Sequence, residues 1–171
     1  MNYTDIYKND TTNGIGIRVV LWTSGCSHHC KECHNPQTWS PTHGFPYTEE
    51  TEKEIINAIN KPYIDGITLS GGDPLYEGNL ETIYALVKKI KNELPNKTIW
   101  IYSGFTWEQI FDGDTPQMIL RKNIIELCDV FVDGLFDINK KNIRLKYCGS
   151  ENQKVIDVQK TLKEKNIILF D

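Results

Sequence analysis

The sequence lacks the features that would place it among membrane or secreted proteins. No apolar run in its 171 residues approaches the length needed to cross a bilayer. The opening stretch, MNYTDIYKND, is polar and has no apolar core of a signal peptide. The five cysteines are an odd number, which excludes a fully paired disulfide framework. We therefore expect a cytoplasmic protein whose thiols stay reduced.

The chain also lacks an excess of positive charge. Its formal net charge is -4, so we expect neither nucleic acid nor a membrane as a partner. The one local exception is a basic run made of Lys140, Lys141, Arg144 and Lys146. This run is either a solvated face or a contact for an acidic partner or ligand. The ordinary composition, without repeats, predicts a single domain over residues 1–171.

What is present is an alternation of strand and helix patterns. Apolar, β-branched runs predict strands at 17–22, 66–70, 98–102, 129–134 and 154–158. Helices are predicted to follow the capping residues Thr48, Asn79, Thr106 and Thr115, with a last short helix at 158–165. In the helix after Thr115, we expect Ile119, Leu120, Ile124 and Leu127 to face inward. This order predicts an α/β fold with a mainly parallel sheet.

The residues with unusual chemistry come directly after the predicted strands. Cys26 follows the first strand and the turn 71–74 follows the second. Ser103 follows the third strand, and Asp133 lies at the end of the fourth. In barrels and open parallel sheets, ligands bind at the edge where the strands end. The pattern therefore predicts one pocket formed by four separate segments.

Three cysteines lie within the eight residues CSHHCKEC, and histidines lie among and beside them. A structural zinc ion could take the three thiolates and one imidazole, although zinc sites usually combine two separate ligand pairs. A [4Fe–4S] cluster held by three thiolates leaves one iron free for a substrate. The residues concerned are Cys26, Cys30, Cys33, His28, His29 and His34. Of the other cysteines, we expect Cys128 in the core and Cys148 in a loop without an assigned role.

Two short motifs resemble those of the radical S-adenosylmethionine (SAM) superfamily. The Cys-x3-Cys-x2-Cys spacing of CSHHCKEC resembles the superfamily's cluster signature. The SGGDP turn resembles its glycine motif, which binds the amino group of the methionine part of SAM. Gly71 and Gly72 would let the backbone approach a ligand closely, and Asp73 could pair with an ammonium group. The position of this turn after the second strand favours ligand binding over an ordinary turn.

From about residue 13 to residue 158, the chain resembles the activating proteins of anaerobic ribonucleotide reductase, which are small radical SAM enzymes. The resemblance rests on NGIGIRVVLWTSGC, HNPQTW, GITLSGGDPLY, IWIYSGFTWEQI, VFVDGLF and GSENQKVIDV. It implies an incomplete (β/α) barrel of radical SAM type. Such an open barrel would leave the cluster side accessible to a large protein substrate.

The resemblance also implies roles for individual residues. Cys26, Cys30 and Cys33 match the cluster ligands. The residues that match SAM-binding positions are Glu32, Cys33, His34, Gly71, Gly72 and Asp73. Ser103 and Asp133, at strand ends, are each either a SAM contact or a structural turn residue.

The implied reaction is an oxidoreductase step carried by cofactors. A flavodoxin-like donor would reduce the cluster, which would cleave SAM to methionine and a 5′-deoxyadenosyl radical. That radical would take a hydrogen atom from one glycine of the large reductase subunit and leave a glycyl radical there. No protein nucleophile or acid–base catalyst is expected. The alternatives are an activase of another glycyl-radical enzyme such as pyruvate formate-lyase, a small-molecule radical SAM enzyme, or a non-catalytic zinc-binding module.

Overall fold

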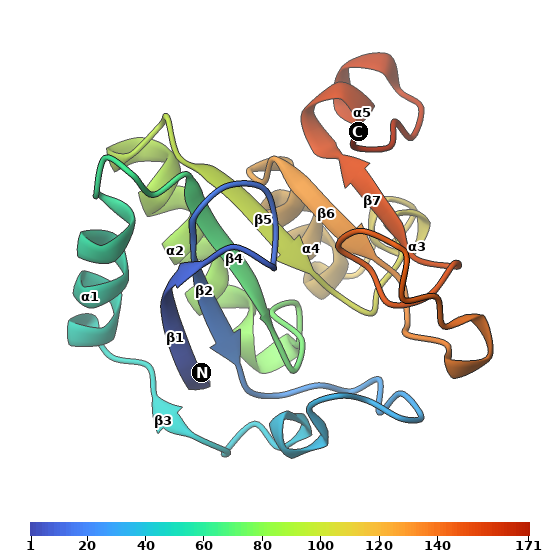
Figure 1. Ribbon diagram of the computed structural model, residues 1–171, viewed down its shortest axis with the longest axis horizontal. Helices are drawn as coiled ribbons and strands as arrows, with labels where there is room; N and C mark the ends of the chain where they lie inside the picture. Colours follow the sequence, from blue (N-terminus) through green and yellow to red (C-terminus); the bar gives the residue numbers. More distant parts are fainter.

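The computed structural model describes residues 1–171 and contains a seven-stranded sheet in the order β3-β1-β2-β4-β5-β6-β7 (Figure 1). The four central strands run parallel: β2 (Arg18–Thr23), β4 (Gly66–Gly71), β5 (Thr98–Tyr102) and β6 (Val130–Asp133). Antiparallel strands flank them, with β1 (Asn2–Asp10) and β3 (Phe45–Pro46) on one side and β7 (Lys154–Asp157) on the other. The predicted α/β fold with a mainly parallel sheet is confirmed, and the sheet is not closed.

Helices cover one face of the sheet and build the main core there (Figure 1). They are α1 (Glu49–Ile59), α2 (Leu80–Glu93) and α4 (Pro116–Glu126), with the shorter α3 (Trp107–Phe111) and α5 (Val158–Glu164) beside α4. Short 3-10 turns form η1 (Pro36–Trp39), η2 (Glu77–Asn79) and η3 (Ile138–Lys140). Val19 and Leu21 of β2 meet Ile55 and Ile83 of the helices in a core that also buries Cys128, as predicted. None of the helices combines the length and apolar character that a bilayer span requires.

Helices begin directly after all four predicted residues, and three of the four cap their helix with the side chain. Thr48 accepts a hydrogen bond from the Thr51 amide at 3.3 Å, and the side chain of Thr115 caps α4 in the same way. Thr106 and Gln109 form the predicted capping box at the start of α3. The expectation for Asn79 is wrong in its chemistry, since its side chain makes no capping hydrogen bond to α2.

The inward face of α4 matches the expected stripe at Leu120, Ile124 and Leu127, which lie in or against the core, and differs at Ile119. Ile119 is half exposed, whereas Arg121 and Ile125 are buried beside Ile124. The buried guanidinium of Arg121 donates to the carbonyl of Leu75 at 2.9 Å. Arg121 therefore occupies the core side of the helix, and Ile119, two residues earlier, faces solvent.

The first strand, β1, was not expected from its polar sequence. It pairs antiparallel with β2, and register shifts interrupt the pairing between Tyr3 and Asp5 and between Tyr7 and Asp10. These irregularities break the simple alternation of buried and exposed residues that identifies a strand. Tyr3 and Ile6 still pack against the core, which holds the strand in place.

The other face of the sheet is filled at the end where the parallel strands begin. The connection between β1 and β2 crosses this face (Figure 1), and Thr68 donates to the carbonyl of Asn13 at 2.7 Å. Arg18 lies buried beneath this connection, donating to Thr68 at 2.8 Å and to the carbonyl of Ile67 at 2.7 Å. Burial lowers the pKa of Arg18 to about 10. Because this end is occupied, space remains at the opposite end, where the strands finish.

Candidate functional site

A cavity of about 230 Å³ lies where the parallel strands end. Four segments that are distant in sequence line it, and each follows one of the strands β2, β4, β5 and β6, as the sequence pattern predicts. The lining includes Cys26, His28, Cys30, Cys33, His34, Gly71, Gly72, Ser103, Gly104, Gly134 and Phe136. Gly149 and Gln153, from the segment before β7, complete the wall.

The start of the cysteine loop is held by backbone hydrogen bonds. Gly25 donates to the carbonyl of Thr38 at 2.8 Å, and Cys26 donates to that of Trp39 at 3.1 Å. Ser24 donates to Asn2 of β1 at 3.0 Å. Cys26, only 9% exposed, is therefore fixed relative to the sheet before any ligand binds.

The middle of the cysteine loop adopts an unusual backbone conformation. His29 and Glu32 have φ angles of 49° and 60°, in the left-handed region that residues other than glycine rarely adopt. These two turns fold the loop so that Cys30 and Cys33 both face the cavity. Glu32 itself is exposed and does not line the cavity. His34 does line it, with its ring 5.9 Å from that of Phe136.

The three thiols all line the cavity, and their chemistry suits an iron–sulfur cluster. No three Cys, His, Asp or Glu side chains of the chain converge on one point within reach of a single ion. A cluster does not require such convergence, because each thiolate binds a different iron. Burial raises the pKa of Cys26 to about 11 and also raises that of Cys30, so a metal bound by these thiolates would have to displace their protons.

The SGGDP turn packs directly against the cysteine loop. A Cβ atom added to Gly71, whose φ is 110°, would lie 2.5 Å from backbone atoms of Thr23. One added to Gly72 would lie 2.6 Å from the carbonyl oxygen of Gly25 and 2.7 Å from that of Thr38. The two glycines are therefore required by the approach of the protein's own backbone, and they bring the turn to the wall of the cavity beside Cys26.

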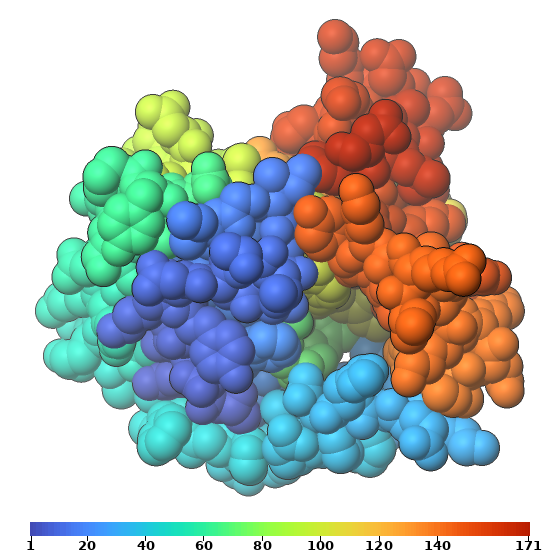
Figure 2. Space-filling view, in the orientation of Figure 1, coloured from blue at the N-terminus to red at the C-terminus, as the bar shows by residue number.

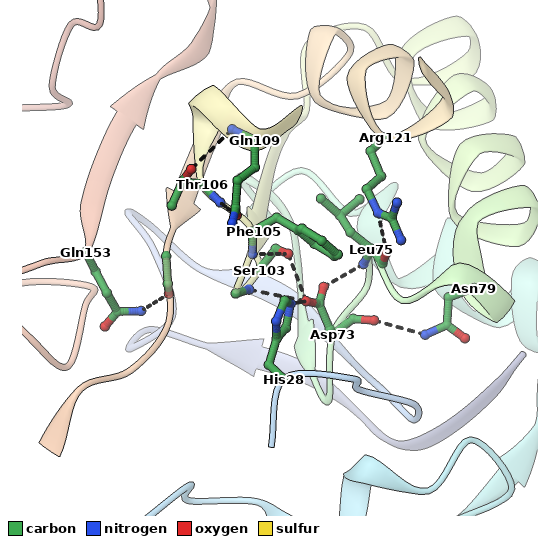
Figure 3. A network of polar contacts seen from close by, with 12 residues as sticks. His28, Asp73, Leu75, Asn79, Ser103, Phe105, Thr106, Gln109, Arg121 and Gln153 are labelled. Atoms are coloured by element: carbon green, nitrogen blue, oxygen red, sulfur yellow. Dashed lines mark hydrogen bonds and ion pairs between the residues drawn. The ribbon is translucent and has the colours of Figure 1, made fainter. Parts of the chain in front are cut away.

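The carboxylate of Asp73 points into the protein and connects three of the cavity segments (Figure 3). The residue is 1% exposed and does not line the cavity. Its Oδ1 accepts from the Leu75 amide at 2.7 Å, and its Oδ2 accepts from the Ser103 hydroxyl at 2.9 Å and from the Gly104 amide at 3.2 Å. His28 Nε2 lies 2.8 Å from the same Oδ2, although not aligned for a hydrogen bond.

Asp133 is placed in a similar way at the end of β6. It is 1% exposed and does not line the cavity. Its two oxygens accept from the backbone amides of Trp107, at 2.9 Å, and Lys154, at 3.0 Å. Burial raises the pKa of this carboxyl group, although the two hydrogen bonds oppose that shift. Asp133 thus joins the end of β6 to α3 and β7, and Gly134 is the residue that reaches the cavity.

Sequence reasoning missed two residues that organise the site. The buried side chain of Asn79 donates to the carbonyls of Ser24, at 2.9 Å, and Asp73, at 3.1 Å. Gln153 accepts from Gly149 and donates to Gly134, each at 2.9 Å. The role of Asn79 could not be predicted, because asparagine at a helix start usually caps the helix.

The sequence predicts no individual role for His28 among the histidines of the cysteine loop. Its ring packs edge-on against Phe105, with centroids 4.6 Å apart, and a Cβ on Gly104 would come within 2.4 Å of it. Cys148 lies in a loop, as expected, beside Trp100 and Tyr102.

Comparison with known proteins gives a consistent family. A family model described as "4Fe-4S single cluster domain" matches residues 12–156. The chain is 38% identical over 155 residues to the anaerobic ribonucleoside-triphosphate reductase-activating protein of Pasteurella multocida (strain Pm70), covering 90% of this chain and 95% of the relative. It is 41% identical to the protein of the same name from Enterobacteria phage T4, covering 91% and 93% of the two chains. The protein of that name from Escherichia coli (strain K12) is 40% identical over 157 residues, covering 91% and 97%.

These relatives match at well over 30% identity across nearly their whole length, and the family model spans the cysteine loop and all four cavity segments. The chain belongs to the family of anaerobic ribonucleoside-triphosphate reductase-activating proteins, which carry a 4Fe-4S cluster domain.

Proposed function

We propose that this protein is a radical SAM activase that generates a glycyl radical on the large subunit of anaerobic ribonucleotide reductase. Residues 1–171 would form one radical SAM domain, and its open sheet would be a shortened version of the radical SAM barrel. The observation that carries the proposal is that the three cysteines and the glycine turn line one cavity, and that the Asp73 amide of the turn donates to the carbonyl of Gly25, directly before Cys26.

Cys26, Cys30 and Cys33 would hold a [4Fe–4S] cluster, with one iron left free for SAM. When bound and reduced, the cluster supplies one electron that splits SAM into methionine and a 5′-deoxyadenosyl radical, which takes a hydrogen atom from the target glycine. Because the cofactors carry the chemistry, the chain's own groups bind, orient and shield them.

The glycine turn would supply backbone groups to the methionine part of SAM. Gly71 and Gly72 both line the cavity, and the approach that lets them do so is possible because neither carries a Cβ that would collide with the backbone behind it. Ser103 and Gly104 lie on the neighbouring wall. Asp73 would act by holding Ser103 and Gly104 in position, because its carboxylate is already bonded to them. Glu32 would contribute through its backbone, and His34 through its place on the cavity wall.

The target glycine and the electron donor must both come from outside the chain. The names of the relatives support the large subunit of anaerobic ribonucleotide reductase as the protein substrate. We propose a flavodoxin-like protein as the donor of the single electron.

The test begins with protein purified without oxygen. We expect about four iron and four sulfide per chain, formation of 5′-deoxyadenosine from SAM on reduction, and an EPR-detectable glycyl radical once the reductase is added. Alanine at Cys26, Cys30 or Cys33 should abolish SAM cleavage. Cys148→Ala, a matched removal of a half-buried thiol outside the cavity, should retain it.

Two results would contradict the proposal. A colourless protein that holds one zinc ion per chain would favour the non-catalytic zinc-binding module. Radical transfer to pyruvate formate-lyase, with none to the ribonucleotide reductase, would instead assign the chain to a different glycyl-radical enzyme.

A further inference from the structure

A basic arm projects beside the mouth of the cavity. It comprises residues 137–148 between β6 and β7, and the residues that flank it, Phe136 and Gly149, line the cavity wall. Figure 2 shows this orange segment standing out from the surface, with a hollow between it and the light-blue segment that contains the cysteine loop. Any large substrate that reaches the cavity must therefore pass close to the arm.

The base of the arm is fastened by hydrogen bonds from both of its ends. The Asp137 amide donates to the Ser150 hydroxyl at 3.1 Å, and Asn152 donates to the carbonyl of Leu135 at 2.8 Å. Lys141 forms a β-bridge with Ser150. The arm is therefore held in one orientation relative to the cavity, which lowers the entropy that a partner must remove on binding.

The tip of the arm combines an apolar side chain with unpaired positive charge. Ile143 is 90% exposed, more than any other large apolar residue of the chain. The cationic side chains of the arm, which form no ion pair, are Lys140, Lys141, Arg144 and Lys146. By contrast, Lys89, Lys91 and Lys154 each form an ion pair with a carboxylate. These four cations lie within seven residues of each other on a chain of net charge -4, so the tip of the arm carries a local excess of positive charge.

We propose that the basic arm docks onto an acidic surface of the large reductase subunit that contains an apolar pocket for Ile143. The cations would guide the encounter, and Ile143 would provide the anchor that holds the target glycine at the cavity. The inference rests on the proposed function and adds the recognition surface to it. Nucleic acid fits less well, because the phosphate backbone offers no pocket for an exposed isoleucine.

Two sets of variants test the docking role against matched controls. Ile143→Asp removes the anchor, and the double variant Lys140→Glu/Lys141→Glu reverses the charge. Ile119→Asp, on the exposed side of α4, and the double variant Lys163→Glu/Lys165→Glu, at and directly after the end of α5, make the same chemical changes elsewhere on the surface. Each protein is assayed for 5′-deoxyadenosine formation without reductase, for binding to the purified large subunit, and for glycyl radical formation.

The arm variants should cleave SAM at the wild-type rate but bind the reductase about 10-fold more weakly or worse. Radical formation should fall in parallel, and wild-type binding should weaken as salt is raised. The control variants should match wild type in all three assays. Wild-type binding and radical formation in the arm variants would overturn the docking role while leaving the proposed function intact. Binding of a fluorescent single-stranded DNA through the arm, with reductase binding unaffected, would also overturn it. Absence of SAM cleavage in the wild type would instead refute the proposed function.

Discussion

The hydroxyl of Ser103 donates a 2.9 Å hydrogen bond to the buried carboxylate of Asp73. This contact joins the end of β5 to the turn after β4, thirty residues earlier in the chain. The same carboxylate also receives the Leu75 and Gly104 amides. Asp73 thus stabilises the segments that form the cavity, and its removal should lower the stability of the protein even when no cofactor is bound.

We expect Asp73→Ala to lower the free energy of unfolding of the cofactor-free protein by about 2–4 kcal/mol. The reason is that three donors, two of them buried, lose the carboxylate that accepts from them. Chemical denaturation followed by circular dichroism measures the change. Asp114→Ala, at an exposed position, is the matched control and should change stability little. Unchanged stability in Asp73→Ala would mean that the carboxylate serves a bound ligand alone.

A methyl group at Gly72 should displace the backbone that holds the start of the cysteine loop. The new Cβ would lie within 2.7 Å of two backbone carbonyl oxygens, neither of which can move without shifting Gly25 or Thr38. Gly72→Ala should destabilise the protein by about 1–3 kcal/mol and lower its iron content. Gly78→Ala is the control, because its Cβ would meet only the ring of Tyr76 at 3.1 Å. Equal iron content and stability in the two variants would contradict this account of the turn.

Loss of the Asn79 amide should weaken the contact between the segment before the cysteine loop and the glycine turn, because Asn79 donates to both. Asn79→Ala leaves the buried carbonyls of Ser24 and Asp73 without this donor, at a cost of about 1–3 kcal/mol. Asn57→Ala, on the exposed face of α1, should be neutral by the same denaturation assay. If the capping interpretation of Asn79 were correct, replacement by serine would restore full stability, whereas we expect it to remain destabilised.

The buried carboxyl group of Asp133 should make part of the stability depend on pH. Because burial raises its pKa in the folded protein, the folded state binds this proton more tightly than the unfolded state does. Its contribution is therefore most favourable below the unfolded pKa of about 3.9 and is lost as pH rises through the higher folded value. The stability of wild type relative to Asp133→Asn should fall across this range and level off above it. A difference that grows with pH, measured by urea unfolding of the cofactor-free protein, would show the opposite shift.

The central strands could be predicted from sequence because they are buried on both faces. Continuous apolar runs such as Val19 to Leu21 and Ile99 to Ile101 have no other plausible place in a folded protein. Strand β1 could not, since none of its residues is fully buried and two register shifts disturb its pattern. The clustering of the site also followed from sequence, because strand ends of a parallel sheet share one edge.

The orientation of individual side chains at that edge was beyond sequence reasoning. The sequence places a carboxylate at Asp73, but its inward direction is decided by donors at Ser103 and Gly104 on another strand end. Asn79 illustrates the same limit, since its two acceptors come from two different loops. Contacts of this kind depend on how the segments pack in three dimensions, which local patterns do not specify.

An open sheet has two free borders, and such borders are where identical chains tend to join into fibres. Here one border ends in β3, only two residues long, where Pro46 has no amide hydrogen to offer. At the other border the C-terminal tail pairs with β7. The Asp157 amide donates to the carbonyl of Ile168, and the Phe170 amide donates to the carbonyl of Val155. The sheet can therefore stay unclosed, and the cavity reachable, with β7 covered by the tail and only the part of β1 beyond Tyr3 left without a partner strand on its outer side.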